Sequence, residues 1–161
     1  TVSLSPTEPV TKPHHFILFR YAETLLNYAE AMNELGGPDY KITGRPTARE
    51  ALNQVRVAAN MPPIEDTGEA FTKRLRNERR VELAFEDHRF WDIRRWLIAD
   101  DEGVMKGAMY GLQLSAVTGA PGKVHYKPYV FENRLWSDRS YLHPIKQTEI
   151  DKGYMLQNPG W

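Results

Sequence analysis

The sequence has no cysteine, no net charge and no long apolar run, and each absence excludes a class of function. Without cysteine, the 161 residues form no disulfide, offer no thiolate and provide no cysteine ligand for a metal. The 21 basic and 21 acidic residues cancel, so no long-range field draws the whole molecule to a nucleic acid or an anionic membrane. No apolar run approaches the length of a bilayer. We therefore expect no nucleic-acid partner and no membrane-spanning segment.

What is present suits one folded domain. Hydrophobic residues make up 41% of the chain and charged residues 26%, which is ordinary for a globular protein of this length. Three prolines and no apolar periodicity over residues 1–15 predict an extended lead-in. We expect a single domain over 1–161, with a helical part at 16–100 and a hairpin and C-terminal tail at 104–161.

Apolar residues at spacings of three and four predict helices in the first part of the chain. A first helix starts near Phe16, and its stripe comprises Ile17, Leu18, Tyr21, Ala22, Leu25, Tyr28, Ala29, Met32 and Leu35. A second helix is capped by Thr47, and small residues dominate its expected buried side, which comprises Ala48, Ala51, Leu52, Val55, Ala58 and Ala59. The third and fourth helices are expected at about 69–86 and 89–98.

The period changes beyond Gly103. Alternation of apolar and polar residues predicts a strand over 110–116, a turn, and a partner strand over 124–131. In the second helix, the spacing of Ala51, Val55, Ala58 and Pro63 matches half of a tetratricopeptide repeat, although a generic helical hairpin explains it as well. The predicted fold is mainly α, with tetratricopeptide-like helical hairpins, a small β-hairpin and long ordered loops, and a tail that packs on the helices.

The stretch from Leu75 to Trp96 carries the densest mixture of acids, arginines and aromatic rings. If the third helix continued through Arg89, two acids, Glu78 and Glu82, would share one apolar arc with Phe85. Like charges four residues apart repel, so we expect a cation between them, supplied by Arg79, Arg89, or a neighbouring-helix arginine such as Arg20 or Arg56. With Asp92 paired to Arg89 or Arg95, this predicts a structural ion network of Glu78, Arg79, Glu82, Arg89 and Asp92.

Paired carboxylates also raise the hypothesis of glycoside hydrolysis by two of Glu78, Glu82 and Glu86. That chemistry needs a raised pKa and an open cleft, whereas crowding by arginine keeps both acids ionised. We therefore predict no catalytic residue and no cofactor. The histidines have no second ligand at metal spacing, so we predict no metal site. A groove lined by Asn27, Glu30 and Asn33 would instead indicate a peptide-binding helical-repeat module.

At these residues the chain resembles a known family, the SusD/RagB outer-membrane glycan-binding lipoproteins of Bacteroidetes. The similarity extends over several blocks: Arg20-Tyr21-Ala22-Glu23, Asn27 to Ala31, Asn53-Gln54-Val55-Arg56, Glu78 to Glu86, Arg89 to Trp96, Tyr141 to Ile145, and Gln157 to Trp161. Asp87 stands where a glycine is usual. Because Asp tolerates the left-handed conformation, we expect the break between the third and fourth helices to persist.

The resemblance implies the C-terminal portion of a longer, non-enzymatic protein. Family members hold an oligosaccharide or polysaccharide at the cell surface and deliver it to a SusC-like TonB-dependent transporter. Membrane contact would come only through a lipid anchor upstream of Thr1, which implies a lipid-anchored, surface-exposed protein of the outer membrane. Glycan sites stack aromatic rings on sugar faces. The rings least explained by helix packing are Tyr126, Tyr129 and Trp136, which we predict as glycan contacts.

Overall fold

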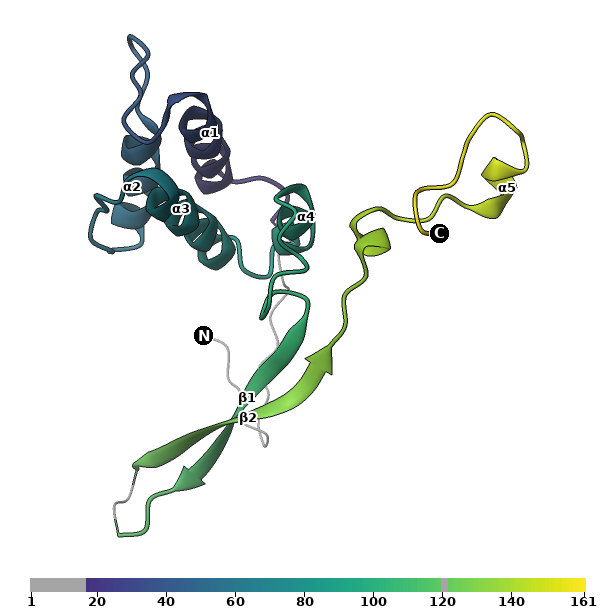
Figure 1. Cartoon of the computed structure of the whole chain (residues 1–161). Coiled ribbons are helices and arrows are strands. Elements are labelled where there is room, and N and C mark those ends of the chain that lie inside the picture. Colours follow the sequence, from purple (N-terminus) through teal and green to yellow (C-terminus); the bar gives the residue numbers. More distant parts are fainter. Residues whose placement is uncertain (1–16, 120–121) are drawn as a thin grey trace. The chain divides into compact units, whose positions relative to one another are not determined.

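The structure is a computed structural model that describes residues 17–119 and 122–161. The chain divides into two compact units, residues 1–89 and 90–161, and each is described by itself. In Figure 1 the helices of the first unit are labelled α1 to α3, and the strands of the second unit β1 and β2. The predicted lead-in at 1–15 lies outside the described residues.

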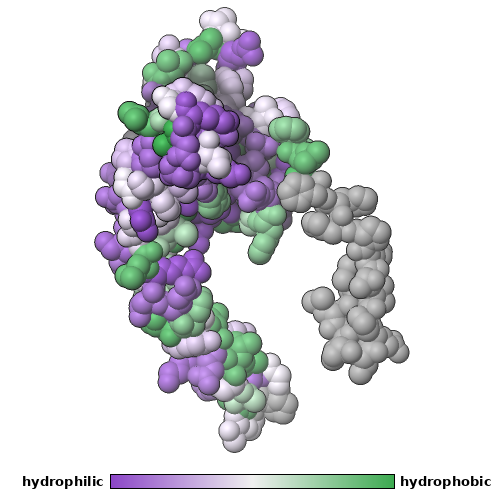
Figure 2. Space-filling model, turned by 90° about the vertical axis from the view of Figure 1, so that its right-hand side faces the viewer, coloured by the Kyte–Doolittle hydropathy of each residue, from purple (hydrophilic) through white to green (hydrophobic). Residues whose placement is uncertain are grey.

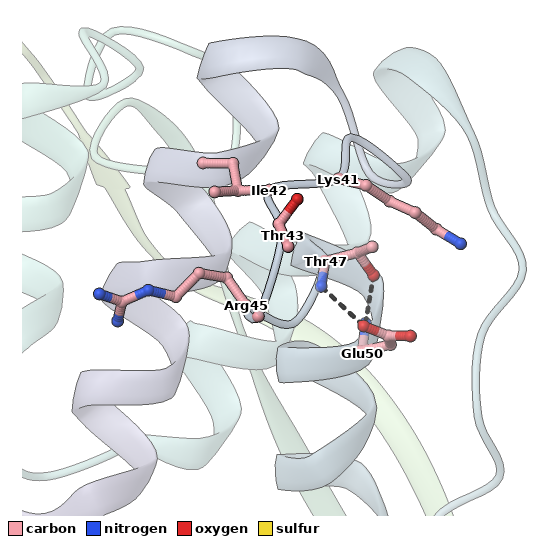
Figure 3. A pocket seen from close by; sticks show the side chains of 7 residues that line it. Lys41, Ile42, Thr43, Arg45, Thr47 and Glu50 are labelled. Carbon is pink, nitrogen blue, oxygen red and sulfur yellow. Dashed lines mark hydrogen bonds between the residues drawn. The ribbon is translucent and has the colours of Figure 1, made fainter.

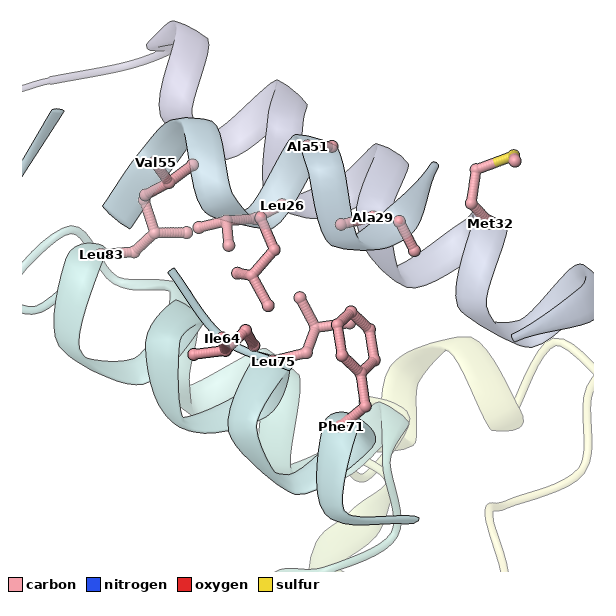
Figure 4. Close-up of a cluster of buried hydrophobic side chains, with 11 residues drawn as sticks. Leu26, Ala29, Met32, Ala51, Val55, Ile64, Phe71, Leu75 and Leu83 are labelled. Atoms are coloured by element: carbon pink, nitrogen blue, oxygen red, sulfur yellow. The ribbon is translucent and has the colours of Figure 1, made fainter. Parts of the chain in front are cut away.

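Three helices build the first unit: α1 (Tyr21–Gly36), α2 (Ala48–Ala58) and α3 (Gly68–Glu82). The side of α1 that carries Leu26 and Ala29 packs on α2 and α3. Ala48 and Ala51 of α2 are fully buried, since small residues allow neighbouring backbones to approach closely. Figure 4 shows the core between the three helices, which consists of Leu26, Ala29, Met32, Ala48, Ala51, Leu52, Val55, Ile64, Phe71, Leu75 and Leu83.

The first helix starts later than predicted and buries a slightly different stripe. Arg20 is extended, with φ −149°, so Ile17 and Leu18 precede the helix and are exposed. Tyr21, at the first helical residue, is also exposed. Leu26, which the predicted stripe omitted, is completely buried. The buried side therefore centres on Leu26 and Ala29, one position away from the expected centre.

Thr47 caps α2 as predicted. Its hydroxyl accepts a hydrogen bond from the backbone N–H of Glu50 at 3.1 Å, and the Glu50 carboxylate accepts one from the N–H of Thr47 at 2.7 Å (Figure 3). This reciprocal capping box satisfies two donors that a helix start leaves free. It contributes about 1 kcal/mol and sets where α2 begins.

Helix α3 ends at Glu82, four residues before the predicted end, and α4 (His88–Arg95) follows a tight turn. The carbonyl of Glu82 accepts a hydrogen bond from the Arg20 guanidinium, whereas a continuing helix would have used that carbonyl for the N–H of Glu86. Phe85 and Asp87 have φ of 66° and 65°. The left-handed Asp87 was predicted. Because the helix stops at Glu82, Phe85 does not share an apolar arc with Glu78 and Glu82, and its ring is fully exposed.

A two-stranded antiparallel ribbon dominates the described part of the second unit. Strands β1 (Gly107–Ala116) and β2 (Val124–Arg134) pair in register from Ala116 opposite Val124, with a bulge between Met109 and Tyr110. Both strands are edges, so Pro128 is accommodated opposite Leu112. The predicted mainly helical fold with a small β-hairpin is confirmed.

The tail contains one 3-10 turn, η1 (Asp138–Tyr141), and one short helix, α5 (Gln147–Ile150). Side-chain contacts link parts of the tail to one another and link the tail to α4. Gln157 clamps both backbone groups of Ile145, at 2.8 and 2.9 Å. The ring of His143 stacks on Phe90, with centroids 5.8 Å apart, so the tail packs on α4 within the second unit.

Candidate functional site

Two of the acids singled out in the sequence bind different arginines. Glu78 is buried in the C-terminal half of α3, and its carboxylate lies 2.5 Å from the Arg56 guanidinium of α2. Only 9% of the Arg56 side chain and 10% of the Glu78 side chain are exposed. Arg56 also donates to the Pro62 carbonyl at 2.8 Å, so it ties α2, α3 and the intervening loop together. Such a pair is charge-assisted and largely shielded from water.

The second arginine, Arg20, joins the start of α1 to the end of α3. It contacts Glu82 at 2.6 Å and Glu86 at 2.8 Å, and it also donates to the Glu82 carbonyl. The hydrogen bond to Glu86, opposed by burial and reinforced by Glu82, raises the pKa of Arg20 above its ordinary value. The planar guanidinium serves three acceptors at once, which a lysine could not do.

Glu78 and Glu82 therefore each have their own guanidinium, rather than one cation shared by both. Both partners come from neighbouring elements, among the arginines that the sequence suggested. Acid and base catalysis needs one protonated and one ionised carboxyl facing a substrate, whereas here arginines hold the acids in place. Among the described residues no group of three His, Asp or Glu side chains is placed to bind a metal.

Polar residues on α1 contact α3. Asn27 accepts a hydrogen bond from Arg79 at 2.6 Å, and Asn33 donates to Thr72 at 3.0 Å. Arg79 is itself buried. These contacts use Asn27 and Asn33 within the helix packing, so the geometry does not support the peptide groove that they would have lined.

The last two predicted network residues lie on α4. Asp92 is buried, with 4% of its side chain exposed, and its carboxylate lies 3.0 Å from Arg95, one of the two partners expected for it. Arg89 is half-buried at the second residue of the helix. The residues of the predicted ion network are thus spread over the two units, and their ion pairs and hydrogen bonds stabilise packing within each unit.

Of the three aromatic residues predicted to contact a glycan, two lie on opposite faces of the hairpin. Side chains alternate along a strand, and no bulge separates Tyr126, opposite Leu114, from Tyr129, opposite Gly111. Tyr126 lies on a face with apolar neighbours, whereas Tyr129 shares its face with Gln113 and Lys127. The register therefore does not bring the two rings together.

The ring of Tyr129 lies against the backbone of Gly111. A Cβ added to Gly111 would lie 3.1 to 3.2 Å from two ring carbons and the hydroxyl oxygen of Tyr129, so a larger residue would push the ring outward by a few tenths of an ångström. About half of Tyr129 remains exposed. A ring supported on one side, with amide, ammonium and hydroxyl groups nearby, is a suitable platform for stacking.

Trp136 follows β2 and packs among other rings. Its centroid lies 5.1 Å from that of Tyr141, and the Arg94 guanidinium lies 5.2 Å from the Trp136 ring. Burial lowers the pKa of Arg94. The indole N–H of Trp136 is buried and finds no acceptor within the described part of the chain. Trp136 therefore has the surroundings of a packed aromatic ring rather than those of a ring exposed for stacking on a sugar.

Pockets in the first unit lie around α2. One of about 350 Å³ is lined by the loop from Lys41 to Arg45 and by the capping-box side chains of Thr47 and Glu50 (Figure 3). Another, of about 330 Å³, is bordered by Arg20, Tyr21 and Glu82. The capping box engages Glu50 at the first pocket, and Arg20 engages Glu82 at the second, so the carboxylate of each pocket already has a partner.

Sequence reasoning from pattern alone missed a set of backbone clamps. Asn53 binds both backbone groups of Ile64, at 2.9 and 3.4 Å, in the way that Gln157 binds Ile145. Asn158 donates to the His143 carbonyl at 2.6 Å. The signal that marks these residues is their presence in the blocks that resemble the SusD/RagB family, because a single polar amide has no periodicity to reveal it.

Comparisons with known proteins agree with this architecture. The model of the SusD family matches residues 5–161. One SusD-like protein of Formosa agariphila is 36% identical over 107 residues, which cover 58% of this chain and 19% of that protein. A second from the same organism is 30% identical over 158 residues, covering 91% and 26%. A crystal structure of a SusD-like protein from Bacteroides fragilis superposes with a TM-score of 0.73 at 32% identity, over 91% of this chain and 26% of that one.

The chain therefore spans about a fifth to a quarter of the length of the relatives that it matches. The second of the two sequence matches and the structural match each cover 91% of this chain. The family match includes both units, from the helices through the hairpin to the tail. The chain belongs to the SusD family.

Proposed function

We propose that these residues form part of a non-catalytic glycan-binding protein, which holds an oligosaccharide or polysaccharide at the cell surface for uptake. The observation that carries this proposal is the family match over residues 5–161. The glycan would pass to a SusC-like TonB-dependent transporter of the outer membrane. Attachment there would depend on a lipid anchor upstream of Thr1. Among the described helices, none is long and apolar enough to cross a membrane.

The arrangement of the acids supports binding rather than cleavage. Arg56 holds Glu78, and Arg20 holds both Glu82 and Glu86. A glycosidase needs a proton donor beside the scissile bond, and a carboxylate engaged by a guanidinium is a poor one. These acids therefore serve the helix packing.

Tyr129 is the predicted ring whose surroundings best suit a sugar. It is half exposed, is supported by Gly111, and shares its face with Gln113 and Lys127. Stacking of a sugar on the ring, with hydrogen bonds to these flanking groups, is the usual chemistry of glycan recognition. Tyr126 and Trp136 are the weaker candidates, because one lies on an apolar face and the other is packed.

A glycan array probed with the 161-residue chain tests the proposal. The same array is probed with a chimera in which the chain replaces the matching quarter of the B. fragilis SusD-like protein. Calorimetry on a glycan that binds then compares Tyr129→Ala with Tyr126→Ala. We expect at least a ten-fold loss of affinity for Tyr129→Ala, equivalent to about 1.4 kcal/mol, and little change for Tyr126→Ala.

The proposal has three parts, namely glycan binding, the role of Tyr129 and the absence of catalysis, and a different result would overturn each. Binding of no glycan by either protein would overturn the glycan-binding function. Binding with equal affinity by the two tyrosine variants would overturn the role of Tyr129 and leave the function standing. Release of shorter sugars from a bound glycan would overturn the non-catalytic assignment.

A further inference from the structure

The charge of the chain is balanced overall, but it is not balanced in the hairpin. Between Gly103 and Phe131 the sequence contains three lysines and no acid. The average over the chain, 21 acids in 161 residues, would place about four acids in a segment of this length. A local excess of positive charge within a neutral protein indicates a surface that meets a negatively charged partner.

Strand alternation divides the hairpin into two faces. One face, which we call the polar hairpin face, comprises three cross-strand pairs: Gly111 with Tyr129, Gln113 with Lys127, and Ser115 with His125. All of these residues except Gly111 are exposed. The other face carries apolar side chains such as Leu112 and Leu114. Figure 2 shows hydrophilic and hydrophobic surface side by side along the hairpin.

Lys127 has no acid among its neighbours on the polar hairpin face. The residue opposite it is Gln113, and the residues two positions away along β2 are a histidine and a tyrosine. An acid opposite a lysine would stabilise the ladder, and the hairpin does without this pair. The next acid along β2, Glu132, lies beyond the bulge and contacts Arg134 at 2.9 Å.

A lysine on an edge strand also discourages pairing with another sheet. That role requires only a charge somewhere on the edge. It explains neither the loss of acids from the whole segment nor the place of Lys127 beside the Tyr129 ring. A ligand that carries negative charge explains both.

An anionic membrane is another partner that a basic hairpin with one apolar face would suit. Membrane binding of this kind inserts apolar side chains, while lysines beside them reach the same headgroups. Lys127 instead lies on the face opposite Leu112 and Leu114. A membrane that took up these leucines would leave the ammonium turned away from it, whereas a glycan on Tyr129 meets the ring and the cation on one face.

The position of Lys127 suits a charged sugar stacked on Tyr129. The two residues stand two apart on one face, so their Cα atoms lie about 7 Å apart. The flexible ammonium can therefore reach substituents of that sugar, and it binds a carboxylate or a sulfate more strongly than a neutral hydroxyl. We propose that the polar hairpin face selects glycans with anionic groups, and that Lys127 contacts the anion; this rests on the glycan-binding function proposed above.

Two pairs of polysaccharides that differ only in charge test the proposal. One pair is polygalacturonate and its methyl ester, and the other is a sulfated galactan before and after removal of its sulfate groups. Calorimetry at low ionic strength measures their binding to the 161-residue chain and to the B. fragilis chimera. The charged member of at least one pair should bind at least five-fold more tightly than the neutral member, the effect of an ion pair at about 4 Å in water. At about 1 M salt, where the Debye length is about 3 Å, the difference should disappear.

Variants of two lysines separate a site from general attraction. Lys127→Gln should abolish the preference for the charged member and leave the affinity for the neutral member unchanged, whereas Lys127→Arg should retain the preference. Lys106→Gln is the matched control, because it removes the same charge from a residue that precedes β1 and lies off the polar hairpin face. Both lysines are exposed, so neither substitution removes a packing contact.

Other results would overturn the proposal. Equal binding of charged and neutral members, or binding of neutral glycans alone on the array, would refute the selection for anionic groups and leave glycan binding standing. An equal loss in Lys127→Gln and Lys106→Gln would show general attraction to the hairpin rather than a site. Binding to vesicles of phosphatidylglycerol that is lost in Lys127→Gln would assign the face to a membrane. Binding of no glycan would overturn the proposed function itself, and this inference with it.

Discussion

Replacing Glu78 by leucine tests the role of the buried acid on α3. Leucine has nearly the same volume, so the change removes the charge without opening a large cavity. The Arg56 guanidinium, with 9% of its side chain exposed, would lose its carboxylate and retain its hydrogen bond to the Pro62 carbonyl. Breaking one side of a buried ion pair costs about 3–5 kcal/mol. With a urea m-value of about 2 kcal/mol/M, the midpoint of unfolding should fall by about 1.5–2.5 M.

Ellipticity at 222 nm is the appropriate signal for this variant, because α1, α2 and α3 all lie in the first unit. Tryptophan fluorescence reports separately on the second unit, which holds all four tryptophans of the sequence. The matched control on the same helix is Glu69→Leu, since Glu69 is 81% exposed beside Lys73, and its midpoint should not change measurably. A shift of less than about 0.3 M for Glu78→Leu would refute the reasoning.

Three further changes test other local interactions. Arg20→Lys should lower stability by about 1–3 kcal/mol in urea unfolding, since lysine cannot fork between two acids and a carbonyl; an unchanged midpoint would contradict this. Phe85→Gly should raise stability by about 1 kcal/mol, because Phe85 is fully exposed at φ 66°, and a decrease would show that the ring has a packing role. The hydrogen bond from Tyr141 lowers the pKa of Asp100, and burial raises the pKa of Tyr141. The Tyr141–Asp100 hydrogen bond therefore stabilises the fold at neutral pH, and this contribution is lost as the pH falls through the lowered pKa of Asp100 or rises through the raised pKa of Tyr141. Unfolding followed by tryptophan fluorescence should show both losses in the wild type and neither in Tyr141→Phe.

Local patterns predicted much of the fold. The Thr47 cap, the hairpin and the left-handed Asp87 follow from residue preferences that act within a few positions. The end of α3 does not, because Arg20 competes for the Glu82 carbonyl from 62 residues away in the sequence. The predicted apolar stripe of α1 lies one position away from the observed one, which includes Leu26. The reason is that Tyr21 and Leu25, four residues apart, match helical periodicity equally well.

In the candidate site, too, some features were predictable from local sequence patterns and others depend on tertiary packing. The sequence predicted that arginine would neutralise the acids, since charges on an apolar stripe require a partner. It did not predict which arginine meets which acid, because that depends on how α1, α2 and α3 pack. The opposite faces of Tyr126 and Tyr129 follow from strand periodicity alone, given their separation of three residues. The support of Tyr129 by Gly111 needs the cross-strand register.

The most direct test of the architectural role of the charged cluster is the stability of a double variant, Arg56→Met with Glu78→Leu. If the pair only neutralises itself inside the helix packing, replacing both members with apolar side chains should restore the urea midpoint to about the wild-type value or above. Each single variant should remain well below it. A double variant no more stable than the singles would show that Glu78 and Arg56 do not act as a pair, and would contradict the account.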